Sequence, residues 1–243
     1  MSGKLIELPK KNELKVLNKS DSVAEILLYG PIGANPWDPD AVSAKDFVDA
    51  LKKIPSSVKT IELRVNSPGG SVFDGMAIYE RLKNHSAKVI AYVDGVAASM
   101  ASVIVLAADE VVLGEGAMYM IHKPLVMTYG NADEHERMID ILDKIESQMI
   151  SIYAKKTGLT RAEIATALAQ ETYYTAEQAV ELGYGDRISA GSDTMKIAAS
   201  IDAQLSGCPW IKNKPAAKNS NDIIREKLRK FNQEAKDFLS KAR

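Results

Sequence analysis

Apolar residues in the first part of the chain form short runs that alternate with stretches of helical periodicity. The run at 23–29 is mostly apolar and ends at a Gly-Pro pair, which predicts a buried strand closed by a turn. Ser43 then precedes a segment with one apolar face, and Pro55 interrupts that segment before a second apolar run at 60–65. We therefore expect a strand, a helix and a second strand in this order.

The same alternation continues toward the middle of the chain. A Gly-rich turn at 66–70 leads into an expected helix at 72–83, a strand at 88–93 and another helix after Ala98. Strands that alternate with helices favour an α/β fold with a mostly parallel sheet and crossover helices. In such folds, functional side chains gather at the carboxyl ends of the strands.

A long helix, which could protrude from its domain, is predicted between Asn131 and Gly158. Asn131 followed by Glu134 is a capping-box pattern, and lysines precede the closing glycine. The same pattern predicts two shorter helices that begin at Thr160 and Thr175. The apolar stripe of the long helix consists of Met138, Ile141, Leu142, Ile145, Met149 and Ile152.

These patterns divide the chain into four segments. Residues 1–20 are expected to be an N-terminal extension, 21–190 a single α/β domain, and 191–220 a linker rich in Ser, Ala, Lys and Pro. Residues 221–243 are expected to form a basic amphipathic helix. A helix of this length is marginal alone in water, so it either docks on a partner or packs on its own domain.

Composition sets limits on the function. With 46% hydrophobic and 26% charged residues, the chain of 243 residues is expected to fold. Its net charge of -1 does not indicate a nucleic-acid partner. The single cysteine, Cys208, cannot form an internal disulfide. Because neither a signal-peptide core nor an apolar run of transmembrane length is visible, we expect a cytoplasmic protein without membrane contact.

Ser99 is the first candidate for chemistry. It lies where an apolar strand turns through small residues into an apolar helix. A hydroxyl at a helix N-terminus lies beside free backbone N–H groups, which can stabilise an oxyanion. For a serine in such a position considered alone, capping of the helix is the more common role.

Two further features change the interpretation of Ser99. His122 follows an apolar run, whereas His85 and His135 lie in polar surroundings, and a histidine can take the proton of a nucleophilic serine. The segment Asn66-Ser67-Pro68-Gly69-Gly70 follows a strand, and its glycines permit close approach of a substrate backbone. Considered alone, the histidine could be structural and the glycine segment a simple turn.

Taken together, three motifs resemble those of the Clp protease proteolytic subunits: the segment 66–70, the Gly-x-Ala-Ala-Ser-Met segment at 95–100, and His-Lys-Pro at 122–124. The resemblance covers about residues 24–188. It implies a ClpP/crotonase-like α/β fold of repeated β-β-α-type units with a mostly parallel sheet and a protruding handle helix. It also implies a homo-oligomeric ring and a protein or peptide substrate. From the sequence itself we expect no cofactor and no metal.

The resemblance assigns roles to individual residues. Ser99 corresponds to the nucleophile and His122 to its general base, and the oxyanion-hole amides correspond to Gly70 and Met100. The third triad member is an aspartate in the family, but the matching position here is Glu171. A glutamate can orient a histidine if the backbone is shifted, or Glu171 could be a solvated carboxylate. Asp186 matches a structural aspartate of the family.

Glu171 before Thr-Tyr-Tyr and the basic C-terminal segment resemble the phage head-maturation (prohead) branch of the family, whose members act during capsid assembly. This predicts a serine endopeptidase with a scaffold or capsid protein as partner. Alternatives are a cellular Clp-type subunit working with an ATPase unfoldase, an inactive ring or assembly subunit, and a crotonase-type acyl-CoA enzyme. Related Ser/Lys signal-peptide peptidases need a catalytic lysine, whereas His122 occupies the corresponding position here.

Overall fold

A single sheet organises the part of the chain that the computed structural model describes, which is residues 13–33 and 41–189. Its strands follow the order β1-β2-β3-β4-β5-β8, and β6 and β7 extend from β4 as a branch. The predicted linker at 191–220 and the C-terminal helix at 221–243 lie outside the described residues, as do residues 1–12.

The first half of the sheet is parallel except at its edge. Strands β2 (Val23–Tyr29), β3 (Thr60–Ser67) and β4 (Lys88–Ala98) pair in parallel, whereas β1 (Glu13–Ser20) pairs with β2 in the antiparallel direction. Residues 13–20, which the sequence assigned to an N-terminal extension, therefore belong to the sheet. Helical and strand periodicity are both weak in this charged segment, so only its pairing with β2 identifies it as a strand.

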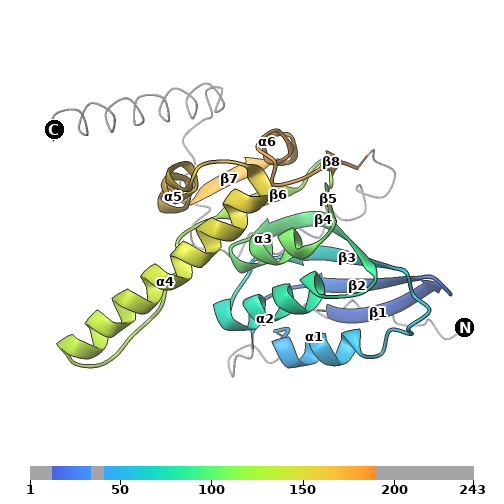
Figure 1. Cartoon of the computed structure of the whole chain (residues 1–243), viewed down its shortest axis with the longest axis horizontal. Coiled ribbons are helices and arrows are strands. Elements are labelled where there is room, and N and C mark those ends of the chain that lie inside the picture. Colours follow the sequence, from blue (N-terminus) through green and yellow to red (C-terminus); the bar gives the residue numbers. More distant parts are fainter. Residues whose placement is uncertain (1–12, 34–40, 190–243) are drawn as a thin grey trace, which may run out of the picture. The chain divides into compact units, whose positions relative to one another are not determined.

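Two crossover helices, α1 (Ala44–Leu51) and α2 (Val72–Lys83), lie along one face of this sheet (Figure 1). Each begins with a serine whose hydroxyl accepts from the backbone amide three residues later: Ser43 caps α1 and Ser71 caps α2. The prediction of a helix at 72–83 is confirmed at both ends. The expected α/β fold with a mostly parallel sheet is also confirmed.

β4 is longer than the predicted strand at 88–93 and changes its partner along its length. Residues 90–93 pair with β5 (Glu110–Leu113), and residues 96–98 pair with β6 (Met118–Ile121), both in parallel. The Asp-Gly pair at 94–95, a dipeptide that favours turns, lies directly after the predicted end of this strand. In the fold it marks the change of partner instead, and the strand continues to the position before Ser99.

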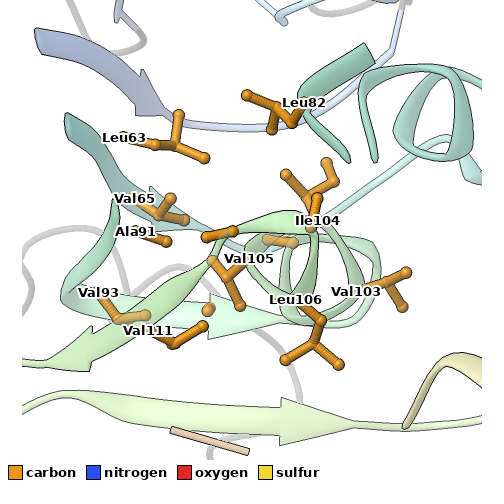
Figure 2. Close-up of a cluster of buried hydrophobic side chains, with 14 of the residues drawn as sticks. Leu63, Val65, Leu82, Ala91, Val93, Val103, Ile104, Val105, Leu106 and Val111 are labelled. Atoms are coloured by element: carbon orange, nitrogen blue, oxygen red, sulfur yellow. The ribbon is translucent and has the colours of Figure 1, made fainter. Parts of the chain in front are cut away.

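The core lies between the sheet and the helices. After β4 come the short helix α3 (Met100–Ile104) and the 3-10 turn η1 (Val105–Ala107), all of whose residues are buried. Figure 2 shows Ile104 and Val105 against side chains from three strands and from α2. This packing places the residue before α3, Ser99, at the border of the core.

The second half of the described chain contains α4 (Ala132–Thr157), α5 (Arg161–Ala169), β7 (Thr172–Thr175), α6 (Ala176–Glu181) and β8 (Arg187–Ile188). The three predicted capping boxes, which begin α4, α5 and α6, are all present. The four-residue strand β7, which sequence reasoning did not identify, pairs antiparallel with β6.

Only one end of α4 packs against the domain. Its C-terminal part buries Met149 and Tyr153, whereas its N-terminal part extends away from the sheet, as Figure 1 shows, and leaves Ile139 and Ile141 exposed. The apolar stripe predicted from the sequence is therefore buried in the domain at Met149 and exposed at Ile141. None of the helices in the described ranges is long and apolar enough to cross a membrane.

Candidate active site

Ser99 occupies the N-cap position of α3 but does not cap it. Its backbone has φ 53° and ψ −122°, and its side chain makes no capping hydrogen bond. A positive φ is costly for a serine and persists only where the surroundings hold it. The capping role that the sequence left open for this residue is therefore wrong, and its hydroxyl points to another partner. Since α3 has only five residues, its dipole adds little, and the local N–H groups matter more.

That partner is His122, which follows β6 directly. The register of β4 and β6 places Ala98 opposite Met120, and the Ser99 amide donates to the Met120 carbonyl at 2.9 Å. The two chain segments therefore end side by side. The Nε2 atom of His122 lies 2.7 Å from the Ser99 hydroxyl oxygen. The structure thus brings together the two residues that the sequence singled out.

Burial determines the protonation of this histidine. Desolvation lowers the pKa of His122 from its usual value of 6.5, and the Glu171 carboxylate opposes this shift. The imidazole is therefore neutral at neutral pH and its Nε2 can accept a proton. A neutral imidazole hydrogen-bonded to a hydroxyl can act as a general base for that hydroxyl.

Glu171 lies beside His122 without forming a hydrogen bond to it. In the β6–β7 ladder Ile121 pairs with Thr172, so the next opposed positions are those of His122 and Glu171. The ladder stops there because Glu171 adopts a positive φ of 48°. The Glu171 side chain is exposed, and its carboxylate acts on the His122 imidazole through its charge. The structure thus places Glu171 next to His122, and its role as the third triad member stays a prediction.

Asp186 has a different environment. Its carboxylate accepts from the Val111 amide at 2.7 Å and from the Lys156 ammonium group at 2.7 and 2.8 Å. These contacts tie α4 to β5 and leave the carboxylate engaged away from His122. This arrangement agrees with the structural part that the sequence indicated for this aspartate.

The glycine segment lies directly against the serine segment. A Cβ atom on Gly69 would lie 2.6 Å from the Ala98 carbonyl oxygen and 2.8 Å from the Met100 nitrogen, and Gly69 has a φ of +88°. Gly70, with a φ of +147°, packs as closely on the Ile32 backbone. Only glycine fits at either position. Neither the Gly70 nor the Met100 amide has a hydrogen-bond acceptor among the described residues.

Gly75 is a site-supporting residue that sequence reasoning missed. It lies inside α2, where a Cβ atom would meet the Cγ atom of Met100 at 2.1 Å. A glycine inside a helical pattern often has such a packing reason, and this signal was available in the sequence. The helix α2 can therefore approach the residue that follows Ser99. No group of three or more His, Cys, Asp or Glu side chains able to hold a metal ion occurs in the described part of the chain.

A serine hydroxyl bonded to a neutral imidazole, beside backbone amides that lack acceptors, is the arrangement of serine hydrolases. Comparison with known proteins gives the particular family. Residues 38–192 match the family described as Clp protease. Because this match spans more than half of the sequence, the chain belongs to the Clp protease family.

Individual relatives agree with this assignment. The chain is 32% identical over 155 residues to the ATP-dependent Clp protease proteolytic subunit 1 of Protochlamydia amoebophila. The matched region covers 61% of this chain and 75% of that protein. It is 32% identical over 158 residues to the protein of the same name from Chlamydia muridarum, covering 61% of this chain and 82% of the relative. The predicted resemblance to this family is thus confirmed.

Proposed function

We propose that the chain is a serine endopeptidase in which Ser99 is the nucleophile and His122 the general base. The observation that carries this proposal is the 2.7 Å contact between the Ser99 hydroxyl and His122 Nε2. The hydroxyl attacks the scissile carbonyl as its proton passes to Nε2. The imidazolium then protonates the leaving amine, and a water molecule activated by the same imidazole hydrolyses the acyl-enzyme.

The oxyanion of the tetrahedral intermediate would lie between the amides of Gly70 and Met100. Both amides lack acceptors among the described residues, and the close contact of Gly69 with residues 98–100 keeps the two segments adjacent. Donors that are fixed before the reaction stabilise developing charge without reorganisation. The absence of side chains at 69 and 70 leaves room for an extended substrate backbone.

Glu171 is proposed as the acidic third member of the triad. It would act by stabilising the positive charge of the imidazolium more than by orienting the imidazole. Its carboxylate opposes the desolvation that lowers the pKa of His122. The same interaction stabilises the imidazolium that forms when the serine attacks. The positive φ of Glu171 distinguishes its backbone from that of the adjoining strand β7.

A fluorophosphonate probe tests this function directly, because it reacts with activated serines. We expect the full-length chain to be labelled at Ser99, as located by peptide mass spectrometry, and to hydrolyse a peptide pool. Ser99→Ala and His122→Ala should lose both properties while remaining folded. His85→Ala is the matched control for the histidine, because His85 lies between α2 and β4, at the opposite end of β4 from Ser99.

The same experiment separates the alternatives. An inactive ring or assembly subunit, or an acyl-CoA enzyme of the crotonase type, presents no activated serine and would remain unlabelled. Hydrolysis that persists in the Ser99→Ala variant would also contradict the mechanism. Labelling that requires Ser99 and His122, but not His85, supports it.

The exposed N-terminal part of α4 supports assembly into a homo-oligomeric ring. Ile139 and Ile141 are 58% and 41% exposed on a helix that extends from its own domain. Apolar side chains in such a position favour association between subunits. Light scattering of the purified chain should show a species of many subunits, and a monomer at micromolar concentration would contradict the ring.

The biological setting that we propose is phage head maturation in the host cytoplasm, with scaffold or capsid protein as substrate. Its support is the sequence around Glu171 and the basic segment at 221–243. The names of the relatives favour the second candidate, a subunit that works with an ATP-dependent unfoldase. Cleavage of a folded substrate only in the presence of an unfoldase and ATP would favour the second candidate, whereas cleavage of assembled scaffold without ATP would favour the first.

A further inference from the structure

Ser102 connects the backbone of Ser99 to the long helix. Its hydroxyl oxygen lies 2.5 Å from the Ser99 carbonyl oxygen and donates to it, and the Ser102 amide donates to the same carbonyl at 3.0 Å. On the other side, the Ser99 amide donates to Met120. Both peptide groups of the strained residue are therefore held by hydrogen bonds.

The Ser102 hydroxyl is itself fixed by a second residue. The Tyr153 hydroxyl of α4 lies 2.7 Å from it, in a fully buried contact. A serine hydroxyl has one hydrogen, and that of Ser102 is used on Ser99, so Tyr153 is the donor of this bond. Tyr119 of β6 donates to the Ser102 carbonyl at 2.5 Å. Burial raises the pKa of Tyr119 and of Tyr153, so both phenols remain protonated donors.

We infer that Ser102 is a positioning residue for the nucleophile, and that Tyr153 completes it by fixing the direction of the Ser102 hydroxyl. This inference rests on the proposed function of Ser99. The chain Tyr153–Ser102–Ser99 holds the positive φ of Ser99, which aims its hydroxyl at His122. The same chain fixes the peptide between Ser99 and Met100, which carries the proposed oxyanion donor. Loss of either hydroxyl should slow acylation without weakening substrate binding.

Tyr119, Tyr153 and Tyr184 form a cluster of buried rings, and Tyr184 provides a control for the loss of the Tyr153 hydroxyl. The ring of Tyr184 contacts those of Tyr119 and Tyr153 at centroid distances of 5.0 and 5.9 Å. Its phenol oxygen is buried without a hydrogen-bond partner among the described residues. Burial raises the pKa of Tyr184, and the nearby Tyr174 adds to this effect, but their geometry is not that of a hydrogen bond. Tyr184→Phe therefore removes a hydroxyl from the same cluster without touching Ser102.

The test compares Ser102→Ala, Tyr153→Phe, their double variant and Tyr184→Phe in the full-length chain. Diisopropyl fluorophosphate is the probe, and the rate of Ser99 labelling is followed by intact mass. Peptide hydrolysis gives kcat and KM, and calorimetry gives Tm. We expect Ser102→Ala to lower kcat and the labelling rate about tenfold with KM unchanged, and Tyr153→Phe to lower them severalfold. Tyr184→Phe should match the wild type.

The double variant Ser102→Ala/Tyr153→Phe tests whether Tyr153 affects Ser99 through Ser102. If Tyr153 acts through Ser102, the double variant should be no slower than Ser102→Ala alone. The acid limb of the pH profile should stay in place, since His122 is unchanged. Multiplying effects, or an equal loss in Tyr184→Phe, would overturn the inference and indicate general packing. If Ser102→Ala does not fold, the comparison of labelling rates between Tyr153→Phe and Tyr184→Phe decides the question. A loss confined to Tyr153→Phe supports the inference, and equal rates overturn it.

The two proposals can fail separately. Absence of labelling at Ser99 in the wild-type chain would overturn the proposed function and, with it, the role of Ser102. Labelling of the wild type, Ser102→Ala and Tyr153→Phe at one common rate would overturn only the inference about positioning.

Discussion

Arg64 of β3 and Asp94 of β4 form a bidentate ion pair across adjacent strands, in which the Asp94 side chain is only 4% exposed. The Tyr29 hydroxyl donates to the same carboxylate at 2.7 Å, and the Arg64 guanidinium lies 5.1 Å from the centre of the Tyr92 ring. The group stands where β4 changes its partner from β5 to β6. It therefore holds three strands together at the point where the sheet branches.

Asp94→Asn should destabilise the fold by roughly 2–4 kcal/mol, because it leaves the Arg64 charge poorly compensated in a largely buried place. The free energy of unfolding in urea measures this change. Asp49→Asn is the matched control, since Asp49 pairs with Lys45 and Lys52 at the surface. It should leave the unfolding midpoint nearly unchanged. Equal effects of the two substitutions would contradict a structural role for Asp94.

Glu171→Gln should move the acid limb of the kcat/KM profile to lower pH. The carboxylate raises the pKa of His122 against the effect of burial, so its removal lets this pKa fall further below 6.5. The reaction needs the neutral imidazole, which then persists to lower pH. The maximal kcat should decrease at the same time, because the imidazolium loses a stabilising charge.

A pH series of peptide hydrolysis measures both effects. Glu115→Gln is the control, because Glu115 is an exposed carboxylate in the turn before β6. A profile for Glu171→Gln that coincides with that of the wild type in position and height would show that Glu171 is a solvated carboxylate.

Gly75→Ala should reduce activity although Gly75 lies in α2 and not in the segment that carries Ser99. Its methyl group would have to displace Met100, whose Cγ atom is 2.1 Å from the Cβ position. Overpacking of this kind costs about 1–3 kcal/mol, against a gain of up to about 1 kcal/mol in helix propensity. Rates of fluorophosphonate labelling should fall together with Tm. Gly116→Ala, which meets nothing within 4 Å, should change neither, and a fully active Gly75→Ala would contradict close packing here.

Ile141→Asp should weaken the oligomer while leaving each subunit folded, because Ile141 is exposed on the projecting part of α4. Light scattering and circular dichroism measure the two properties. Met149→Asp should instead unfold the subunit, since Met149 is 2% exposed in the core of its own domain. Met149 belongs to the apolar stripe predicted from the sequence, but it packs in the core of its own domain and is therefore not available as an interface residue. An unchanged oligomer in Ile141→Asp would exclude this face as the interface.

Sequence reasoning succeeded where a feature depends on neighbouring residues. Helix caps such as Asn131 with Glu134 involve residues three apart, and the Ser99 and His122 segments follow apolar strands that a local pattern reveals. It failed where partners are distant in the chain. The bond between Ser102 and Tyr153 joins residues 51 positions apart, and the change of partner in β4 depends on which strands lie beside it. The backbone of Glu171 likewise follows from the end of the β6–β7 ladder.

The branching of the sheet at β4 has a consequence for the serine and the histidine. Ser99 follows β4, which belongs to the large parallel layer, whereas His122 follows β6, which joins this layer through the three pairs at residues 96–98 and the bond from the Ser99 amide to Met120. The two reacting groups thus lie at the end of one short ladder. A displacement of β6 relative to β4 would separate the hydroxyl from the imidazole while every side chain of the site kept its own conformation. Activity should therefore depend on how β6 and β7 are held against β4.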